Sequence, residues 1–313
     1  MPAQLMYGKP VAEQMEERVK AGVCELTRKY HVVPRLDIVL IGDHPESATY
    51  VRKKREACER LGMRAELHLF NTKITGDDLK EHVYALSHDD NVHGILIQLP
   101  LPDHIEEPRR EPQGPRPTDK FDIFDTIAGE KDVDGLSCHC VPELYRARQQ
   151  DLLFLPCTAL AVRRMIAFYG IPTHGKTAVV VGRNDITSKP ILAMMGGRMC
   201  NATAVWAHRH TPKEVHDRLM READIIVTAV GNPKYQVTRD LVKPGATVID
   251  VGTRVGPDGK LHGDADLASV SQVAAFVTPV PGGVGPVTVA ALAENMLRAA
   301  QFAIGIGKRG YDF

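Results

Sequence analysis

Lys54 lies where a helical pattern would bury it. Tyr50, Lys54, Cys58 and Leu61 recur at spacings of three and four residues, so in a helix they share one face. Because loss of water disfavours a charged ammonium, a lysine on that face can exchange protons near neutral pH. The spacing therefore allows a proton-transfer group with Tyr50 one turn away, whereas Lys53 and Arg55 project elsewhere and can stay in water. Helical spacing alone favours the other interpretation, a lysine whose stem covers the core while its ammonium reaches solvent.

A glutamine at the end of a predicted strand favours the first interpretation. Gly94 to Leu99 has the composition of a buried strand, with Gln98 near its carboxyl end. Lys54 follows another such run, Leu36 to Ile41, and ligands of open α/β sheets bind beyond the carboxyl ends of the strands. We therefore expect Gln98 to hydrogen-bond Lys54 and hold it in place. Gln98 alone would also fit an edge-of-sheet polar residue.

Two acidic residues lie in one short segment, Lys131-Asp-Val-Asp-Gly135. Its Asp-Gly pair is a strong turn signal, so a purely structural turn is one explanation. A metal site is another, but the ligand series of an EF-hand does not follow, and no bound metal is expected. A single buried carboxylate here would also pair with an amidine-like edge of a heterocyclic ligand through two parallel hydrogen bonds.

A loop of unusual composition precedes the last predicted helix. Thr278 to Pro286 contains three glycines and three prolines in nine residues. Glycine lets the main chain approach a ligand closely, and proline restricts its conformations. The composition indicates a ligand-lining loop with a defined backbone path.

The second half contains a candidate dinucleotide site. Val179 to Arg183 is a strand that runs into a turn, as at a bound pyrophosphate, although the usual G-x-G-x-x-G is absent. The next strand leads into Arg209, where an NAD site normally has an acidic residue. Two guanidinium groups, Arg183 and Arg209, suit a ribose 2′-phosphate, so NADP is preferred over NAD. A basic surface turn is the alternative.

Alternating strands and helices must position these residues. The first half predicts helices over 11–30, 47–61 and 76–87 and strands over 36–41, 65–70 and 94–99. The second predicts strands over 177–181, 202–206, 224–229 and 246–251 and a helix over 288–302. This rhythm indicates parallel α/β units, and 313 residues suit two domains. We expect a catalytic domain over 1–155 with helix 288–313 packing back on it, a Rossmann-like domain over 156–287, and a cleft between them.

Composition excludes several classes of function. Thirty-nine basic residues balance 39 acidic ones, which argues against a nucleic-acid partner. No run of 18 apolar residues predicts a membrane span, and the first residues resemble neither a signal nor a transit peptide. Six scattered cysteines lack zinc spacing and are expected to be reduced in a cytoplasmic protein. The proline-rich stretch over residues 106–120 cannot build a core, so we expect a surface loop there, with a binding role as the alternative.

Together these segments resemble the bifunctional methylenetetrahydrofolate dehydrogenase/cyclohydrolase family. The motifs that carry the resemblance occur in the family's order: YVRKK (50–54), GILIQLPLP (94–102), KDVDG (131–135), PCT (156–158), VGR (181–183), ADIIVTAVG (223–231), VIDVG (248–252) and residues 278–288.

The resemblance implies a role for each motif. Lys54 would be the essential proton-transfer residue of the cyclohydrolase step, tuned by Gln98. Tyr50 would pack on the folate and Asp134 would bind its pterin. The remaining folate contacts would be Leu99, Pro100, Pro281, Gly282, Gly283, Val284 and Gly285. NADP would contact Gly182, Arg183, Asn184, Arg209 and Thr253. The resemblance also implies a homodimer formed through the cofactor domains and a place in one-carbon metabolism, including purine biosynthesis.

Departures from the family pattern concern mainly the cofactor half. The Pro156-Cys-Thr158 motif continues with Ala-Leu-Ala rather than Pro-x-Gly, and Asn184 and Thr187-Ser188 replace Ser and Val-Gly of the cofactor turn. Residues 106–120 have no counterpart in shorter members. Three alternatives remain: a monofunctional dehydrogenase, which the presence of Lys54 and Gln98 disfavours; a dehydrogenase for another small substrate; and a folate- or nucleotide-binding regulatory protein with an inactive site.

Overall fold

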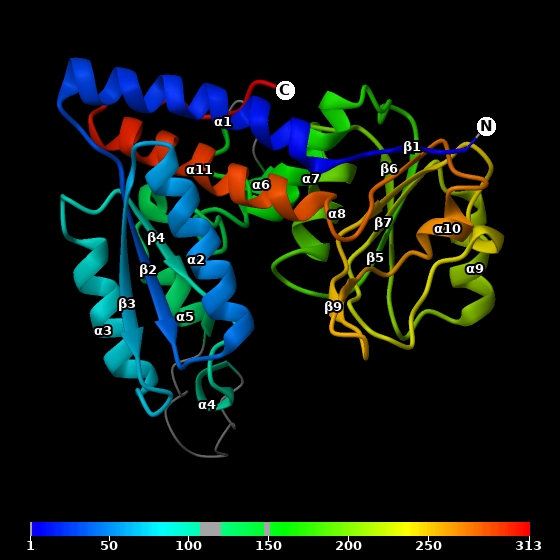
Figure 1. Ribbon diagram of the computed structural model, residues 1–313, viewed down its shortest axis with the longest axis horizontal. Helices are drawn as coiled ribbons and strands as arrows, with labels where there is room; N and C mark the ends of the chain where they lie inside the picture. Colours follow the sequence, from blue (N-terminus) through cyan, green and yellow to red (C-terminus); the bar gives the residue numbers. More distant parts are fainter. Residues whose placement is uncertain (1, 107–119, 147–150) are drawn as a thin grey trace.

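The computed structural model describes residues 2–106, 120–146 and 151–313. Two α/β units lie side by side, each with its own parallel sheet, and long helices run across from one to the other (Figure 1). The predicted fold class is confirmed.

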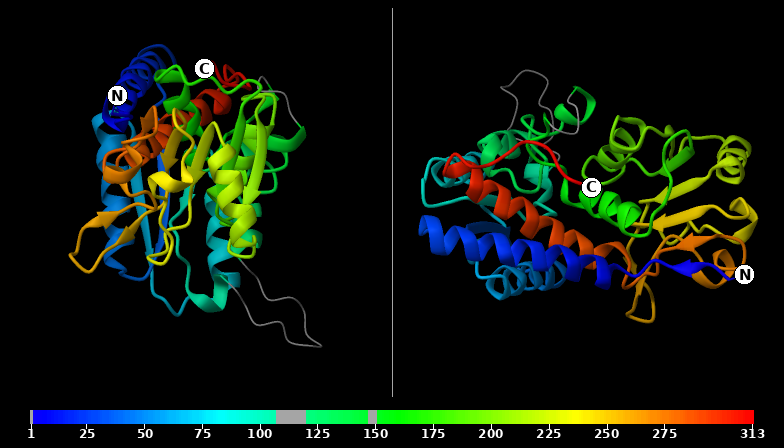
Figure 2. Two further views of the ribbon diagram at one scale, coloured as in Figure 1. Left: turned by 90° about the vertical axis from the view of Figure 1, so that its right-hand side faces the viewer. Right: turned by 90° about the horizontal axis from the view of Figure 1, so that it is seen from above.

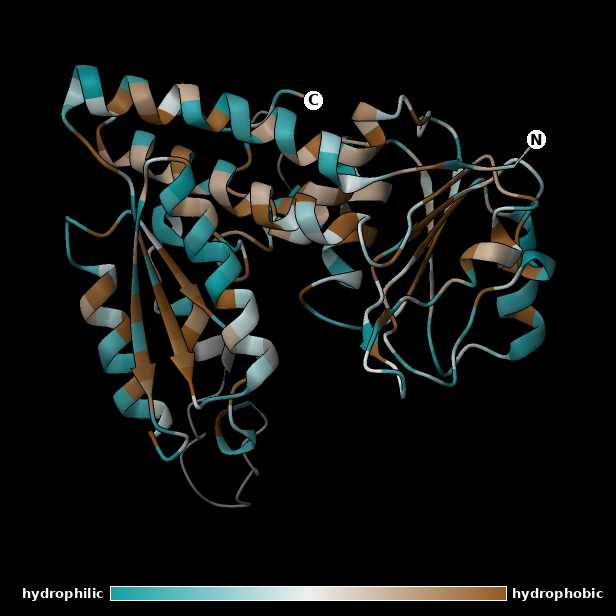
Figure 3. Cartoon of the chain, in the orientation of Figure 1, coloured by the Kyte–Doolittle hydropathy of each residue, from teal (hydrophilic) through white to brown (hydrophobic). Residues whose placement is uncertain are grey.

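The first unit has a three-stranded parallel sheet in the order β3-β2-β4. Its strands are β2 (Arg35–Ile41), β3 (Arg64–Phe70) and β4 (Gly94–Ile97). Six of the seven β2 residues are buried, as expected for a central strand covered on both faces. Helices α2 (Pro45–Arg60) and α3 (Gly76–Ser87) flank this sheet (Figure 1). The β2 and β4 arrows are accordingly hydrophobic in Figure 3.

The second unit has a six-stranded sheet in the order β1-β11-β8-β7-β5-β6. Its predicted strands are β5 (Thr177–Val181), β6 (Thr203–Ala207), β7 (Ile225–Thr228) and β8 (Thr247–Asp250). Two short strands, β11 (Phe276–Val277) and β1 (Gln4–Leu5), complete it, and β1 comes from the very start of the chain. Helices α8 (Ser188–Gly196), α9 (Lys213–Glu222) and α10 (Leu267–Val270) accompany the sheet, and a small hairpin joins β9 (Arg254–Val255) to β10 (Leu261–His262).

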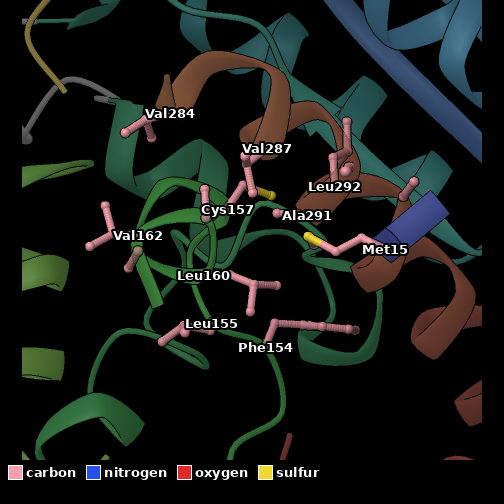
Figure 4. Close-up of a cluster of buried hydrophobic side chains, with 14 of the residues drawn as sticks. Met15, Phe154, Leu155, Cys157, Leu160, Val162, Val284, Val287, Ala291 and Leu292 are labelled. Carbon is pink, nitrogen blue, oxygen red and sulfur yellow. The ribbon is translucent and has the colours of Figure 1, made fainter. Parts of the chain in front are cut away.

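Three helices connect the two units. Helix α1 (Gly8–Glu25), which continues as a π-helical turn over Leu26–Tyr30, lies alongside α11 (Val284–Ala303), and α11 also packs on α7 (Cys157–Phe168) and α2 (Figure 2). Their shared core is drawn in Figure 4, where Val287, Ala291 and Leu292 of α11 lie near Met15 of α1 and Leu160 of α7. Half of the residues of α11 are buried, and many of them are alanines, as in a helix enclosed by its neighbours.

Short helical turns complete the described chain: α4 (Asp103–Glu106), α5 (Lys120–Asp125), α6 (Glu143–Arg146) and 3-10 turns over Gly129–Lys131 and Arg239–Leu241. Within those described ranges, no helix is both long enough and apolar enough to cross a bilayer.

Several expectations need correction. Helix α11 begins at Val284 rather than Thr288, so the last part of the proline-glycine segment is helical. Strand β4 ends at Ile97, so Gln98 and Leu99 follow the strand. Glu106, the first residue of the expected surface loop, is instead the last residue of helix α4, whose Ile105 packs in the core of the first unit. Most of the predicted loop, residues 107–119, lies outside the described residues.

Candidate active site

Lys54 and Gln98 meet at the carboxyl end of the first sheet. The Lys54 Nζ donates a hydrogen bond to Gln98 Oε1 over 2.9 Å, as the sequence predicted. The backbone N–H of Gln98 still bonds to Val39 O on β2, so the residue is fixed by the sheet although it follows β4. Its Nε2 donates to Leu99 O over 2.8 Å, which turns the amide oxygen toward the lysine.

The face of α2 that carries Lys54 is covered at one end and open at the other. Cys58 and Leu61 are buried, Lys54 is partly buried, and Tyr50 is 43% exposed. The expectation that Tyr50 shares a buried stripe is therefore wrong. Helix α2 begins four residues after β2 ends, so its first turns lie beyond the strands that would cover them. Arg55, expected in water, is partly buried and its Nε lacks a hydrogen-bond partner.

The structure separates the two acidic residues of the KDVDG turn. Asp132 is fully enclosed, and its carboxylate accepts hydrogen bonds from the N–H groups of Gly135 (3.0 Å) and Ser137 (2.8 Å). Burial raises the pKa of Asp132 despite these bonds. Asp134 is only partly buried. Asp132 thus serves the turn, and Asp134 keeps a carboxylate at the surface of the site.

Cys157 brings the acidic turn and Lys54 into one neighbourhood. This buried thiol, at the start of α7, donates to Val133 O over 3.3 Å. Burial raises its pKa well above the ordinary value, the Asp134 carboxylate beside it raises it further, and the Lys54 ammonium opposes both. The carboxylate and the ammonium therefore both act on one sulfur atom. A thiol kept protonated in this way is a structural group rather than a nucleophile.

The proline-glycine loop packs against the start of α1. Gly8 donates its N–H to Gly282 O over 2.8 Å, and a Cβ on Gly8 would lie 1.9 Å from Gly283 O. Pro281 and Gly285 are exposed, Gly282 is partly buried, and Gly283 and Val284 are buried. The Val280–Pro281 bond is cis, as is Leu99–Pro100 in the other proline motif, where Leu99 is partly buried and Pro100 is exposed.

A pocket of about 790 Å³ lies at the carboxyl ends of the second sheet. It includes four of the five predicted cofactor residues, namely Gly182, Arg183, Asn184 and Arg209. Thr253 is exposed and does not line the pocket, although its carbonyl approaches Gly231 in the adjoining loop. His208, directly after β6, and Ala229, Val230 and Asn232, after β7, also line it. The lining residues that the sequence did not single out include Lys213, His216, Lys234 and Tyr235. Lys213, in the first turn of the helix that follows β6, is the signal in the sequence that could have identified this side of the pocket.

Gly182 shapes the phosphate end of this pocket. Its φ is +135°, and a Cβ there would lie 2.4 Å from Ser188 Oγ and 2.5 Å from Ala229 O. The absence of a side chain therefore lets the turn after β5 pack closely against the start of α8 and the residue after β7. Asn184, at the position of the family's serine, accepts hydrogen bonds through its Oδ1 from the N–H groups of Ile186 (2.8 Å) and Thr187 (3.2 Å).

The charge of the pocket suits a phosphorylated ligand. Four cationic side chains line it, Arg183, Arg209, Lys213 and Lys234, against one carboxylate, Asp217. Hydrogen bonds from Lys213 and His216 occupy that carboxylate and lower its pKa. The glycine cradle and the excess of cations therefore fit a dinucleotide with several phosphates.

Two buried carboxylates organise the loops beside the pocket: Asp250, in the VIDVG motif, and Asp264, which the sequence did not single out. Asp264 accepts from the N–H groups of Val230 (2.8 Å) and Gly231 (2.9 Å). Asp250 accepts from Ala265 N–H (2.7 Å) and from the Thr228 hydroxyl (3.1 Å), and burial raises its pKa to about 6. Among the described residues, no group of three or more His, Cys, Asp or Glu is placed to hold a metal ion.

A Rossmann-like unit with a phosphate cradle, beside an α/β unit with a paired lysine, defines a two-domain nucleotide-dependent enzyme of the α/β class. Residues 6–134 match the tetrahydrofolate dehydrogenase/cyclohydrolase catalytic domain, and residues 156–304 match the NAD(P)-binding domain of the same family. The chain belongs to the tetrahydrofolate dehydrogenase/cyclohydrolase family, as its motifs predicted.

Relatives match along nearly the whole chain. The bifunctional protein FolD of Moorella thermoacetica is 41% identical over 302 residues, which cover 96% of this chain and 100% of the relative. The crystal structure of the bifunctional FolD methylenetetrahydrofolate dehydrogenase/cyclohydrolase from Campylobacter jejuni has a TM-score of 0.86 at 35% identity and covers 96% and 99% of the two chains. The Trypanosoma brucei enzyme, solved with NADP cofactor and inhibitor, has a TM-score of 0.87 at 32% identity and covers 97% and 99%.

Proposed function

We propose that this protein oxidises 5,10-methylenetetrahydrofolate to 5,10-methenyltetrahydrofolate with NADP⁺ and then hydrolyses the methenyl compound to 10-formyltetrahydrofolate. The hydrogen-bonded Lys54–Gln98 pair, close to Cys157 and the Asp134 turn, carries the proposal. Both activities use one folate site between the two domains, 1–155 and 156–287.

Folate binding is assigned to the first unit and the loop before α11. Asp134 retains an accessible carboxylate, which pairs with the amidine-like edge of the pterin. Tyr50 leaves an exposed ring on the face of α2 that carries Lys54, and this ring packs on the folate. Leu99, Pro100 and the residues from Pro281 to Gly285 line the remainder of the site.

The cofactor is assigned to the pocket of the second unit. Gly182, Arg183 and Asn184 face the pyrophosphate, and Arg209 together with Arg183 binds the ribose 2′-phosphate. When bound, NADP⁺ supplies the hydride acceptor for the oxidation. The protein contributes proximity and orientation, because Asp264 fixes the N–H groups of the loop after β7.

Hydrolysis of the methenyl compound is assigned to Lys54. A water oxygen bonds to the methenyl carbon, the bond from that carbon to N5 breaks, and N5 gains a proton. One further proton leaves to solvent, which balances the loss of the positive charge of the methenyl cation. Lys54 transfers these protons while Gln98 holds its Nζ in position.

A spectrophotometric assay tests the proposal and its alternatives together. Purified protein is mixed with methylenetetrahydrofolate and NADP⁺ or NAD⁺, and reduced cofactor and methenyl absorbance are followed separately. We expect faster reduction of NADP⁺ than of NAD⁺, with loss of added methenyltetrahydrofolate in the absence of cofactor. Oxidation without hydrolysis would indicate a monofunctional dehydrogenase, and binding without turnover would indicate a regulatory protein.

Assembly and location extend the proposal. We infer a cytoplasmic homodimer that contributes to one-carbon metabolism and purine biosynthesis. Strand β6 supports dimerisation through the cofactor domain, because it is an edge of the six-stranded sheet and carries Trp206, 37% exposed. Light scattering on the purified protein should give twice the mass of the chain, and a monomeric mass would contradict this part of the proposal.

A further inference from the structure

The last residues of the chain return to the core beside the proposed folate site. Tyr311 is buried, and its hydroxyl lies between two segments distant in sequence. It accepts a hydrogen bond from Leu155 N–H over 2.9 Å and donates one to Asn295 Oδ1 over 2.6 Å. Leu155 immediately precedes the Pro156-Cys157 motif, so the tail contacts the chain directly before that motif.

Asn295, on α11, extends this contact to the acidic turn. Its side chain is fully buried, and its Nδ2 donates to Val133 O over 2.8 Å and to Leu155 O over 3.1 Å. Val133 O also accepts from the Cys157 thiol. One amide group therefore joins the residue before Asp134 to the segment before Cys157.

The Tyr311 hydroxyl determines which way that amide points. A hydroxyl has one proton, and because this oxygen accepts from Leu155 N–H, its own proton is available for Asn295 Oδ1. The carbonyl side of the amide is thereby held toward Tyr311 and both N–H bonds are directed at carbonyl oxygens. Without the hydroxyl, the buried Leu155 N–H and Asn295 Oδ1 would lose a partner, which is costly away from water.

The tail is itself held firmly. Arg298 donates to Gly310 O over 2.6 Å, and its guanidinium lies 4.1 Å from the centre of the Tyr311 ring. Arg164 bonds to Asp312 O, and the Phe313 ring stacks on Tyr311. The Tyr311 side chain therefore belongs to a segment that several contacts hold in place.

We propose that Tyr311 and Asn295 are positioning residues that hold the Asp134 turn and Cys157 in the arrangement required for folate binding. This inference rests on the proposed function, since it assigns the turn to folate. Both residues act through backbone groups of Val133 and Leu155, and neither is assigned a contact with substrate or cofactor.

Tyr311→Phe removes the hydroxyl and keeps the buried ring. The KM for methylenetetrahydrofolate should rise roughly fivefold to tenfold, while kcat and the Kd for NADP⁺ stay within about twofold, because one buried partner is lost and only the turn is displaced. Tyr145→Phe, at an exposed tyrosine, is the matched control and should change nothing. Asn295→Asp, which cannot donate to both carbonyls, should raise the same KM, and the double variant should be no worse than the more affected single one.

A second measurement does not depend on turnover. Alkylation of Cys157 by a maleimide, followed by mass spectrometry of its peptide, should be at least about tenfold faster in Tyr311→Phe, because loss of the hydroxyl frees the groups that enclose the thiol. Unchanged alkylation and an unchanged folate KM would overturn the inference, as would equal increases in the folate KM and the Kd for NADP⁺. A wild-type protein with no activity on folate would instead overturn the proposed function, and the alkylation rates would still decide whether Tyr311 positions the turn.

Discussion

Lys54 Nζ and Gln98 Oε1 are separated by 2.9 Å, although the two residues are 44 positions apart in the chain. The amide of Gln98 has a fixed direction, because its Nε2 is bonded to Leu99 O. The ammonium therefore contacts the amide oxygen of Gln98. This hydrogen bond fixes the position of the Lys54 side chain on helix α2 relative to the end of strand β4.

Replacement of the lysine tests the hydrolytic assignment. Lys54→Met keeps the length of the stem but removes the group that transfers protons. Hydrolysis of methenyltetrahydrofolate should fall by at least ~10²-fold, the usual contribution of general acid–base catalysis. Lys53→Met, at the exposed neighbouring lysine, should retain the wild-type rate. Wild-type hydrolysis by purified Lys54→Met protein would remove Lys54 from the mechanism.

Gln98 should separate the two activities. In Gln98→Glu a carboxylate faces the ammonium and stabilises its charged form, so proton exchange becomes harder. We expect hydrolysis to fall about tenfold or more while oxidation of methylenetetrahydrofolate is affected far less. The ratio of the two rates, measured on one preparation, is the readout. A parallel loss of both would show that Gln98 acts on folate binding instead.

Arg209 should decide between the two nicotinamide cofactors. Arg209→Ala removes a guanidinium from the pocket that lacks an acidic residue at the end of β6. The KM for NADP⁺ should rise about tenfold or more, whereas the KM for NAD⁺, which has no 2′-phosphate, should change little. Arg218→Ala, on α9 but outside the pocket, is the control. An equal effect on both cofactors would contradict a 2′-phosphate contact.

How much of this arrangement the sequence predicts depends on the distance over which each signal acts. Helical spacing and the strand-end rule were enough to bring Lys54 to Gln98, because α2 follows β2 and Gln98 follows β4, and these two strands are neighbours in one sheet. Spacing could not show that Tyr50 lies beyond the covering strands, because exposure depends on where neighbouring elements stop. Strand β1 was missed since its two residues gain order only from β11, about 270 residues later.

Polar groups buried by tertiary contacts were equally hidden. Nothing local marks Asp264, Asn295 or Tyr311, whose partners lie on other elements. The Pro-Gly composition near residue 280 did indicate a constrained backbone. It did not indicate that α11 would begin at Val284, because proline is tolerated in the first turn of a helix.

Asp250 should make stability depend on pH. Burial raises its pKa in the folded protein to about 6 from an ordinary 3.8, so its contribution is fully present below about pH 4 and is lost as pH rises through about 6. This group should lower the free energy of unfolding by up to about 3 kcal/mol between pH 4 and pH 8. Asp264 nearby, whose pKa burial also raises, acts in the same direction.

Urea unfolding of wild-type protein and Asp250→Asn at a series of pH values isolates this contribution. The wild-type advantage should be largest near about pH 4 and should shrink as pH rises. A difference that grows with pH would show that Asp250 is stabilised in its charged form.

Two glycines at the junction of the units should respond oppositely to alanine. A Cβ on Gly8 would meet Gly283 O at 1.9 Å, so backbone must move, and Gly8→Ala should cost at least about 2 kcal/mol. A Cβ on Gly285 meets nothing within 4 Å, and alanine in the first turn of α11 should stabilise by about 0.5 kcal/mol. Chemical denaturation measures both changes, and equal tolerance at the two positions would be inconsistent with the close packing at Gly8.

The first segment of the chain packs in the second unit, and the last segment packs in the first. Gln4 and Leu5 complete the sheet of the cofactor-binding half, while α11 and the tail complete the other half. If recombination replaced only the middle of the gene, the six-stranded sheet would come from one parent and its edge strand β1 from the other. A segment cut out at residues 156–287 would therefore lack one edge strand of its own sheet.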